Sequence, residues 1–388
     1  MSNAPTYNID PAAFWVNPYP DLAVMRRDAP IAFVPELDAT LLTRRDAIFR
    51  EEKRTHVFSS EQPGGLMSQL MGENMMRKDG DAHMIERKMI FPTVSPRTVR
   101  DVWKEQFVSA TRGILDRLAA KGSGDLVRDY AMPVSAEALK SMTGLTNMRY
   151  DEMDRVSQGM IDGCANYAGD AAIEANCHDC TASVDRHIDA QIPVLSAAPD
   201  QSLLSVSMNA GMPEQQIRAN IKLAISGGQN EPRDAIAGAI SALLEHSEQL
   251  QLVLKGKASW LAVFEEYARW MSPIGMSPRR IAREDTIDGV TFYPEDRAFL
   301  MFGSANRDEA VFDAPDKFDV LRDTGPAISF GAGPHFCAGA WASRCLIAEV
   351  ALPMFFERFK NIELVDPVQY RGWAFRGPLS VYAKWLVQ

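Results

Sequence analysis

A lone cysteine lies in a turn-rich, almost uncharged stretch near the C-terminal end of the chain, residues 329–339. Gly331 and Gly333 precede Cys337 and Gly339 follows it, so the backbone can bend tightly and pass close to a flat partner. A long helical pattern begins directly afterwards. A cysteine just before a helix N-terminus is favoured as thiolate by the helix dipole and by unpaired backbone N–H groups. The stretch therefore predicts a shielded thiolate, which is a soft ligand suited to iron.

His83 and Arg87 are a second pair with chemical potential, in a segment that opens with Asp79-Gly80. Residues four apart share one face of a helix, so these two side chains could grip a carboxylate together. From the pattern alone, a surface helix with scattered charge is the usual explanation of such a pair.

A possible zinc site is the main competing pattern. Cys177 and Cys180 form a Cys-x-x-Cys pair, with Cys164 and His187 nearby in the sequence. Cysteine and histidine at such spacings can bind zinc, but a second close pair is missing. The ordinary alternative is a set of reduced cysteines on helices, because an odd total of five cysteines without a signal peptide argues against disulfides.

The elements that must position these groups are mostly helical. Residues 215–245 have helical apolar spacing on both sides of a break at 227–232, which holds two glycines and Pro232. Glycine and proline destabilise a helix interior, and such a break marks a place where something else must fit. Residues 31–34 and 39–43 are short apolar runs that predict a hairpin.

Composition limits the function further. The chain has 388 residues, 46% of them hydrophobic, and a net charge of −10. This balance supports a large core and disfavours binding to nucleic acid or to an anionic membrane. No secretory signal and no run of about 18 apolar residues is visible, so we expect a cytoplasmic protein without a membrane span.

The cysteine stretch resembles the haem-binding loop of the cytochromes P450, which reads Phe, Gly, any, Gly, any, His, any, Cys, any, Gly. The matching positions are Phe330, Gly331, Gly333, His335, Cys337 and Gly339. The resemblance extends over nearly the whole chain and implies one domain over residues 1–388. That domain would be mainly α with small β-sheets, with haem b between the central long helix and the helix after the cysteine loop.

Roles for other residues follow from the resemblance. Cys337 would be the axial iron ligand, and His83, Arg87 and Arg280 would hold the haem propionates. Glu266 and Arg269 match the family's structural Glu-x-x-Arg pair. The Met-rich residues 61–76 would correspond to the family's lid over the substrate, whereas packing in the core is the more usual role for any one of these methionines. The resemblance also suggests substrate-pocket positions: Leu223, Gly227, Gly228, Ile274, Ser277 and Phe375.

The helix break departs from the family pattern. An acid followed by threonine is usual there, and the alcohol supports the water that protonates bound dioxygen. Here Glu231 keeps the acid, while Pro232 has neither hydroxyl nor N–H. A one-residue shift of the alignment would place Asn230 and Glu231 at the two positions, and the alcohol is missing either way. Protons would then travel through Glu231, Gln229, Asn230 and water.

The Glu-Pro pair and the tail 371–378 are similar to bacterial aromatic O-demethylases that act on guaiacol-type methoxyphenols. The resemblance thus implies insertion of one oxygen atom of O2 into a small hydrophobic substrate, such as a methoxyphenol or an alkylaromatic. Three other functions remain open: a peroxide-driven peroxygenase, a hydroxylase of terpenes or fatty acids, and a non-catalytic haem or zinc sensor. A haem-thiolate dehydratase or isomerase has no positive sign.

Electrons would have to come from a separate protein, because no flavin, nicotinamide or iron–sulfur segment is present. We expect a ferredoxin, a flavodoxin or a partner of the ferredoxin-reductase type. Basic residues concentrate in one segment and after the cysteine loop, and they predict a dock for an acidic partner. They are Arg77, Lys78, Arg87, Lys88, Arg97, Arg100, Lys104 and Arg344. A solvated helix face is the plainer explanation.

Overall fold

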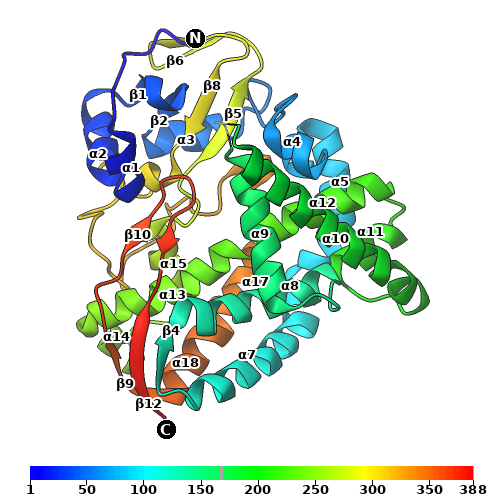
Figure 1. Ribbon diagram of the computed structural model, residues 1–388. Helices are drawn as coiled ribbons and strands as arrows, with labels where there is room; N and C mark the ends of the chain where they lie inside the picture. The colour runs from blue at the N-terminus through cyan, green and yellow to red at the C-terminus, as the bar shows by residue number, and fades with distance from the viewer. Residues whose placement is uncertain (167–168, 388) are drawn as a thin grey trace. The chain divides into compact units, whose positions relative to one another are not determined.

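The computed structural model (Figure 1) describes residues 1–166 and 169–387. The chain divides into two compact units. Unit 1 comprises Met1–Gln62, Gly238–Cys337 and Asp366–Val381. Unit 2 comprises Pro63–Ala237, Ala338–Val365 and Tyr382–Gln388. A single domain over the whole chain stays a prediction.

Unit 1 is built on a five-stranded sheet with the order β1-β2-β8-β5-β3. Its strands are β1 (Ile31–Val34), β2 (Ala39–Leu42), β3 (Phe58–Ser59), β5 (Ser277–Ile281) and β8 (Arg297–Leu300). The predicted hairpin is confirmed, because Ile31 pairs with Leu42 and Val34 with Ala39 in antiparallel register. Both faces of the sheet are buried: Ala298 and Leu300 join one hydrophobic cluster, whereas Phe299 joins another.

Helices and two small hairpins complete unit 1. The helices are α1 (Pro11–Val16), α2 (Tyr19–Asp28), α3 (Arg45–Glu51), α14 (Ser247–Leu254), α15 (Trp260–Met271) and α16 (Phe302–Ala305), with 3-10 turns η1 (Pro35–Leu37) and η5 (Gly333–His335). The hairpin strands are β6 (Asp285–Ile287) with β7 (Val290–Phe292), and β10 (Tyr370–Arg371) with β11 (Gly377–Pro378).

Unit 2 is almost entirely helical. Its α-helices are α4 (Leu66–Met71), α5 (Gly80–Val94), α6 (Pro96–Thr98), α7 (Lys104–Ala119), α8 (Met132–Thr143), α9 (Tyr150–Cys164), α10 (Ala171–Ala197), α11 (Leu203–Asn209), α12 (Glu214–Ser226), α17 (Ala340–Arg344) and α18 (Leu352–Arg358). A 3-10 turn, η2 (Met75–Arg77), and three π-helical turns, η3 (Val99–Trp103), η4 (Val127–Ala131) and η6 (Cys345–Ala351), join them. A small sheet has the order β4 (Ser123–Asp125), β12 (Tyr382–Val387), β9 (Phe359–Leu364).

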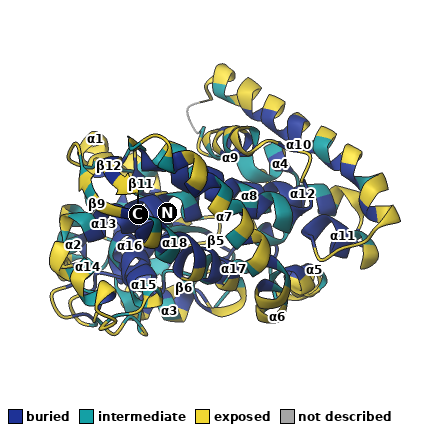
Figure 2. Cartoon of the chain, turned by 90° about the horizontal axis from the view of Figure 1, so that it is seen from below, coloured by how far each residue is buried: buried dark blue, intermediate teal, exposed yellow. Residues whose placement is uncertain are grey.

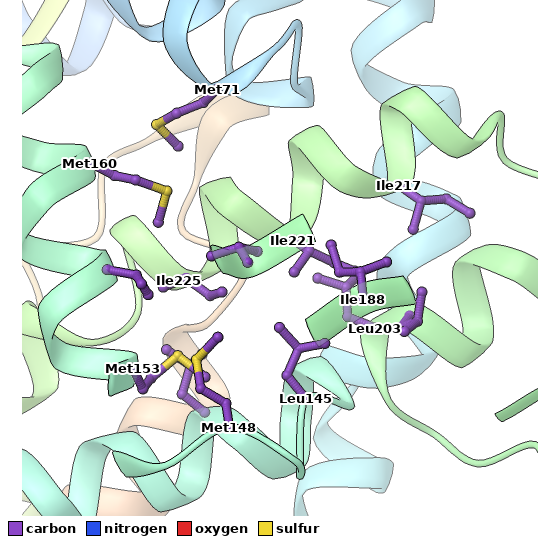
Figure 3. Close-up of a cluster of buried hydrophobic side chains, with 14 of the residues drawn as sticks. Met71, Leu145, Met148, Met153, Met160, Ile188, Leu203, Ile217, Ile221 and Ile225 are labelled. Atoms are coloured by element: carbon purple, nitrogen blue, oxygen red, sulfur yellow. The ribbon is translucent and has the colours of Figure 1, made fainter. Parts of the chain in front are cut away.

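The core of unit 2 is rich in methionine and isoleucine (Figure 3). Met71 from α4 and Met160 from α9 approach each other, and Ile221 and Ile225 of α12 reach into the same cluster. Met67 and Met75 pack against its edge. Flexible thioethers fill irregular gaps between helices, so these methionines act at least in part as core residues.

The long helix predicted for 215–245 is broken where the glycines lie. α12 ends at Ser226, and α13 (Asn230–Glu245) begins four residues later. Pro232 is the third residue of α13, where a missing N–H costs no intrahelical bond.

The mainly helical fold class is confirmed by the elements of both units. Figure 2 shows α10 with one exposed and one buried side, and no described helix is long and apolar enough to cross a membrane.

Candidate active site

The cysteine loop of unit 1 is held by its own backbone. The N–H of Cys337 donates to the carbonyl of Phe330 at 2.9 Å, and the N–H of Gly331 donates to Ile328 at 2.9 Å. Among the five cysteines, only Cys337 is exposed. The loop therefore closes on itself and presents this thiol outward.

Two glycines of the loop adopt backbone conformations that other residues rarely reach. Gly331 has φ 74° and Gly333 has φ 71°. A Cβ at Gly331 would lie 2.8 Å from Oε1 of Glu52, and one at Gly333 would lie 2.9 Å from Cγ of Lys53. The spacing read from the sequence thus reflects close approach to the end of α3.

Aromatic rings flank the cysteine. Phe330 packs edge-on against Phe264 of α15 at a centroid distance of 6.0 Å, and Phe336 lies 6.4 Å from Phe330. His335 ends the turn η5 and is partly exposed, whereas Gly339 caps the N-terminus of α17 in unit 2. The loop surface beside the thiol is accordingly apolar and aromatic.

Arg280 on β5 points to acidic partners at the rim of unit 1. Its guanidinium donates to Oε1 of Glu295 at 2.6 Å and to the carbonyl of Glu61 at 3.0 Å. Side chains alternate along a strand, so Arg279 faces the other way and is 3% exposed. Arg279 faces the Glu52 carboxylate at 3.6 Å, and the propionate role of Arg280 stays a prediction.

His83 and Arg87 lie on α5 in unit 2, as the helical spacing indicated. His83 is buried and Arg87 is partly exposed. Next to them, Glu86 is buried and bonded to both Lys78 and Asn220, the latter at 2.7 Å. The inner face of α5 is therefore polar and ordered.

The break between α12 and α13 is tied to neighbouring helices. Ser135 of α8 donates to the carbonyl of Gln229 at 2.7 Å. The Gln229 amide donates to Asp154 of α9 at 3.0 Å, and the Asn230 amide donates to Gln158 at 3.1 Å. Both amides thus fix the geometry of the break and hold Glu231 beside them.

Glu231 is the candidate acid. Its Oε2 atom is shut off from solvent and has no hydrogen-bond partner among residues 1–166 and 169–387. Desolvation, reinforced by the charge of Asp234, raises the pKa of Glu231 to about 7. Its own backbone N–H and Arg233 act in the opposite direction and lower the pKa. A carboxyl group with a pKa near neutrality can both take and give a proton.

Sequence reasoning missed the groups around Glu231. Arg233 donates to Asp234 at 2.8 Å and to Asp154 at 3.1 Å, and burial raises the pKa of Asp234. Asp154 is partly exposed on α9. The Glu-Pro-Arg-Asp run would have signalled this cluster, because residues three apart share a helix face.

The proposed pocket residues fall into two groups. Leu223, Gly227 and Gly228 lie at the C-terminal end of α12 in unit 2. Ile274 and Phe375 form an isolated antiparallel bridge in unit 1, and Phe375 is 44% exposed. Ser277 begins β5, three residues beyond Ile274.

The cysteines of unit 2 form no metal site. Among the described residues, no cluster of three or more His, Cys, Asp or Glu side chains could hold a metal ion. Burial raises the pKa of Cys177 to about 11 and that of Cys164 to about 12. The zinc alternative therefore has no support in this part of the chain.

The donors of the cysteine loop fit an iron porphyrin. The thiol of Cys337, on a glycine-bound, apolar loop, would supply a soft ligand to the iron, and Phe330 and Phe336 would supply a surface for a flat ring. These residues suit the chemistry of a haem-thiolate centre.

Comparison with known proteins gives the same result. The sequence model of the family described as Cytochrome P450 matches residues 261–369. A steroid C26-monooxygenase from Mycolicibacterium smegmatis is 26% identical over 366 residues, which cover 92% of this chain and 90% of that protein. The vitamin D(3) 25-hydroxylase of Pseudonocardia autotrophica is 26% identical over 376 residues, or 92% and 91% of the two chains. The crystal structure of P450BioI in complex with an acyl carrier protein carrying hexadec-9Z-enoic acid superposes with a TM-score of 0.89 at 22% identity, covering 96% of this chain and all of that one.

Proposed function

Because this chain belongs to the cytochrome P450 family and is a monooxygenase with a Cys-ligated haem b, we propose that Cys337 is the iron ligand and that the substrate is a small aromatic such as a methoxyphenol. The haem and O2 supply the oxidising chemistry, and the protein supplies ligand, dryness and orientation. The sensor alternative is overturned by the monooxygenase relatives.

The bridge between Ile274 and Phe375 is the observation that carries the substrate proposal. The N–H of Gly275 donates to the carbonyl of Ala374 at 2.8 Å, and the N–H of Arg376 donates to Pro273 at 2.9 Å. These bonds fix the hairpin tip on residues 273–275 and leave the Phe375 ring exposed. An aromatic ring carried on this fixed backbone favours stacking against an aromatic substrate.

Glu231 is proposed as the proton donor that replaces the missing alcohol. Gln229 and Asn230 hold the break through Asp154 and Gln158, so the carboxyl group keeps its place without a neighbouring threonine. Asp154 is partly exposed and shares Arg233 with Asp234. This cluster supports a route by which protons from solvent recharge Glu231 through water.

Electron supply is proposed to come from a separate acidic protein of the ferredoxin or flavodoxin type. Lys88 and Arg100 are exposed in unit 2, and so are the rings of Phe91 and Trp341. An apolar area with cationic neighbours suits a transient acidic partner. Arg77 and Lys78 are buried, so they do not belong to this surface.

A cytoplasmic location remains the expectation from the sequence.

A second function, hydroxylation of a larger hydrophobic substrate, is favoured by the relatives named as steroid and vitamin D(3) hydroxylases. A spectral titration of the ferric protein with methoxyphenols, alkylaromatics, steroids and fatty acids separates the two. We expect a low-to-high-spin shift with methoxyphenols and formaldehyde release on turnover. A shift with steroids or fatty acids alone would refute the aromatic proposal.

Two variants locate the substrate ring. Phe375→Ala should weaken methoxyphenol binding about 3- to 10-fold, because an aromatic pair contributes about 0.5–1.5 kcal/mol beyond its buried area. Leu379→Ala changes an exposed apolar residue of the same tail, 56% exposed against 44% for Phe375, and should leave binding unchanged. Turnover with hydrogen peroxide alone, at the rate seen with an electron donor, would instead identify a peroxygenase.

A further inference from the structure

Glu52 is a buried carboxylate beside the cysteine loop that the proposed chemistry does not use. It follows the last residue of α3 and is 1% exposed. Few glutamates are buried so completely unless their oxygens are bonded, so the partners of this one are informative.

Both oxygens of Glu52 are engaged within unit 1. Oε2 accepts the backbone N–H of Ala332 at 2.5 Å, and Ala332 lies between the two glycines of the cysteine loop. Oε1 faces the guanidinium of Arg279 on β5, with an N···O distance of 3.6 Å. Glu52 thereby joins three elements: the end of α3, the central sheet and the loop that carries Cys337.

The loop is shaped around this carboxylate. A Cβ at Gly331 would meet Oε1 of Glu52 at 2.8 Å, so only glycine lets the loop come this close. Burial raises the pKa of Glu52 to about 7, and Arg279, the Ala332 N–H and Lys53 act in the opposite direction. The group is held where its hydrogen bond, rather than hydration, stabilises it.

We propose that Glu52 is a positioning residue for the Cys337 loop, because its carboxylate anchors Ala332 and Gly331 to α3 and, through Arg279, to the sheet. The proposal rests on Cys337 as the iron ligand. Without the anchor, residues 331–336 would move more freely, and the thiolate would be held less firmly at the iron.

Adjacent Glu51 provides a matched control. It is 0% exposed and pairs with Arg50 at 2.5 Å and Arg54 at 2.7 Å, neither of which belongs to the cysteine loop. Glu51→Leu and Glu52→Leu therefore remove the same charge at the same depth. Only the second removes a contact with Ala332.

Hydrogen exchange in the haem-loaded protein provides the test. We expect amide exchange of the peptide 329–337 to be about 10-fold faster in Glu52→Leu, because a charge-assisted hydrogen bond is lost, and unchanged in Glu51→Leu. The fraction of ferrous–CO protein that absorbs as the thiol-ligated form should at least double in Glu52→Leu alone. Equal exchange in the two variants would overturn the proposal.

Conservative variants protect the test against misfolding. Glu52→Gln keeps an oxygen that can accept the Ala332 N–H, so its exchange should rise only about 2- to 3-fold, while Glu51→Gln should match the wild type. No difference between these two would also overturn the proposal. Cys337→Ser tests the ligand separately: a thiolate spectrum that survives it removes Cys337 as the ligand, whereas the exchange comparison between Glu52 and Glu51 stands by itself.

Discussion

Replacing Arg269 by methionine should severely destabilise unit 1. Arg269 is fully buried on α15 and makes a bidentate pair with Glu266, at 2.7 and 2.8 Å. The same guanidinium donates to the backbone carbonyls of Asn306 and Pro315 at 2.9 Å and of Lys317 at 3.1 Å. One side chain therefore satisfies a buried carboxylate and three carbonyls of the segment leading to the cysteine loop.

The expected loss follows from what the substitution leaves behind. Methionine fills much of the volume, so the cavity contribution is small. Breaking a buried pair by removing one partner costs about 3–5 kcal/mol, because the remaining charge stays buried. Glu266 keeps the Asp319 N–H at 2.9 Å and Arg322 at 3.2 Å, which limits the loss, so we expect about 3–4 kcal/mol.

Urea unfolding of the haem-loaded protein, followed by far-ultraviolet circular dichroism, measures this loss as a lower midpoint with unchanged slope. Arg26→Met is the matched control. Arg26 makes a bidentate pair with Glu309 at 3.0 Å, but the Glu309 side chain is 53% exposed and can be rehydrated. A loss below about 1 kcal/mol for Arg269→Met, or one no larger than that for Arg26→Met, would refute the reasoning.

Three further predictions concern pH, packing and electron supply. The pKa of Glu231 is raised to about 7 in the folded state, so the folded protein loses stability as pH rises from the unfolded value near 4.3 through about 7. The stability advantage of Glu231→Gln should therefore grow by roughly 1–3 kcal/mol between pH 5 and pH 9, and a constant difference would contradict the raised pKa. Gly238→Ala should lower the free energy of unfolding by about 1–3 kcal/mol, because a Cβ there overlaps the Tyr267 hydroxyl. Adding Tyr267→Phe should restore part of this loss, and additive effects of the two substitutions on the free energy of unfolding would argue against the clash. The double variant Lys88→Glu, Arg100→Glu should be reduced about 10-fold more slowly by an acidic ferredoxin at low salt, with unchanged substrate binding. Arg128→Glu should be reduced at the wild-type rate, and equal rates in the wild type and both variants would refute the proposed docking surface.

The cysteine loop was the part of the site most readable from the sequence. Gly331 and Gly333 stand where the backbone has positive φ and where Glu52 and Lys53 approach, so spacing and shape coincide at these two positions. The break after α12 was equally readable, because glycine and proline act locally. The hairpin of residues 31–42 followed from short apolar runs for the same reason.

Contacts between distant segments were not readable. Glu52 looks like part of a charged surface run, yet it is buried and faces Arg279, which lies more than 200 residues away in sequence. On β5, a choice between Arg279 and Arg280 depends on strand register, where a shift of one residue reverses the face. Arg77 and Lys78 belong to a basic run in the sequence, which shows their charge but not their burial. Lys78 is buried against Glu86, a partner that the sequence does not reveal.

The crossing of α9 and α10 has a consequence for the evolution of this chain. A Cβ at Gly159 would overlap the sulfur of Cys180, and one at Gly163 would lie 2.5 Å from the sulfur of Cys177. Each glycine and its facing cysteine therefore share one fixed volume. Across related sequences, positions 159 and 180 should covary, as should 163 and 177, with a larger residue on one helix accompanied by a smaller one on the other. The Cys-x-x-Cys spacing on α10 is thus the steric complement of Gly-x-x-x-Gly on α9 at this helix crossing.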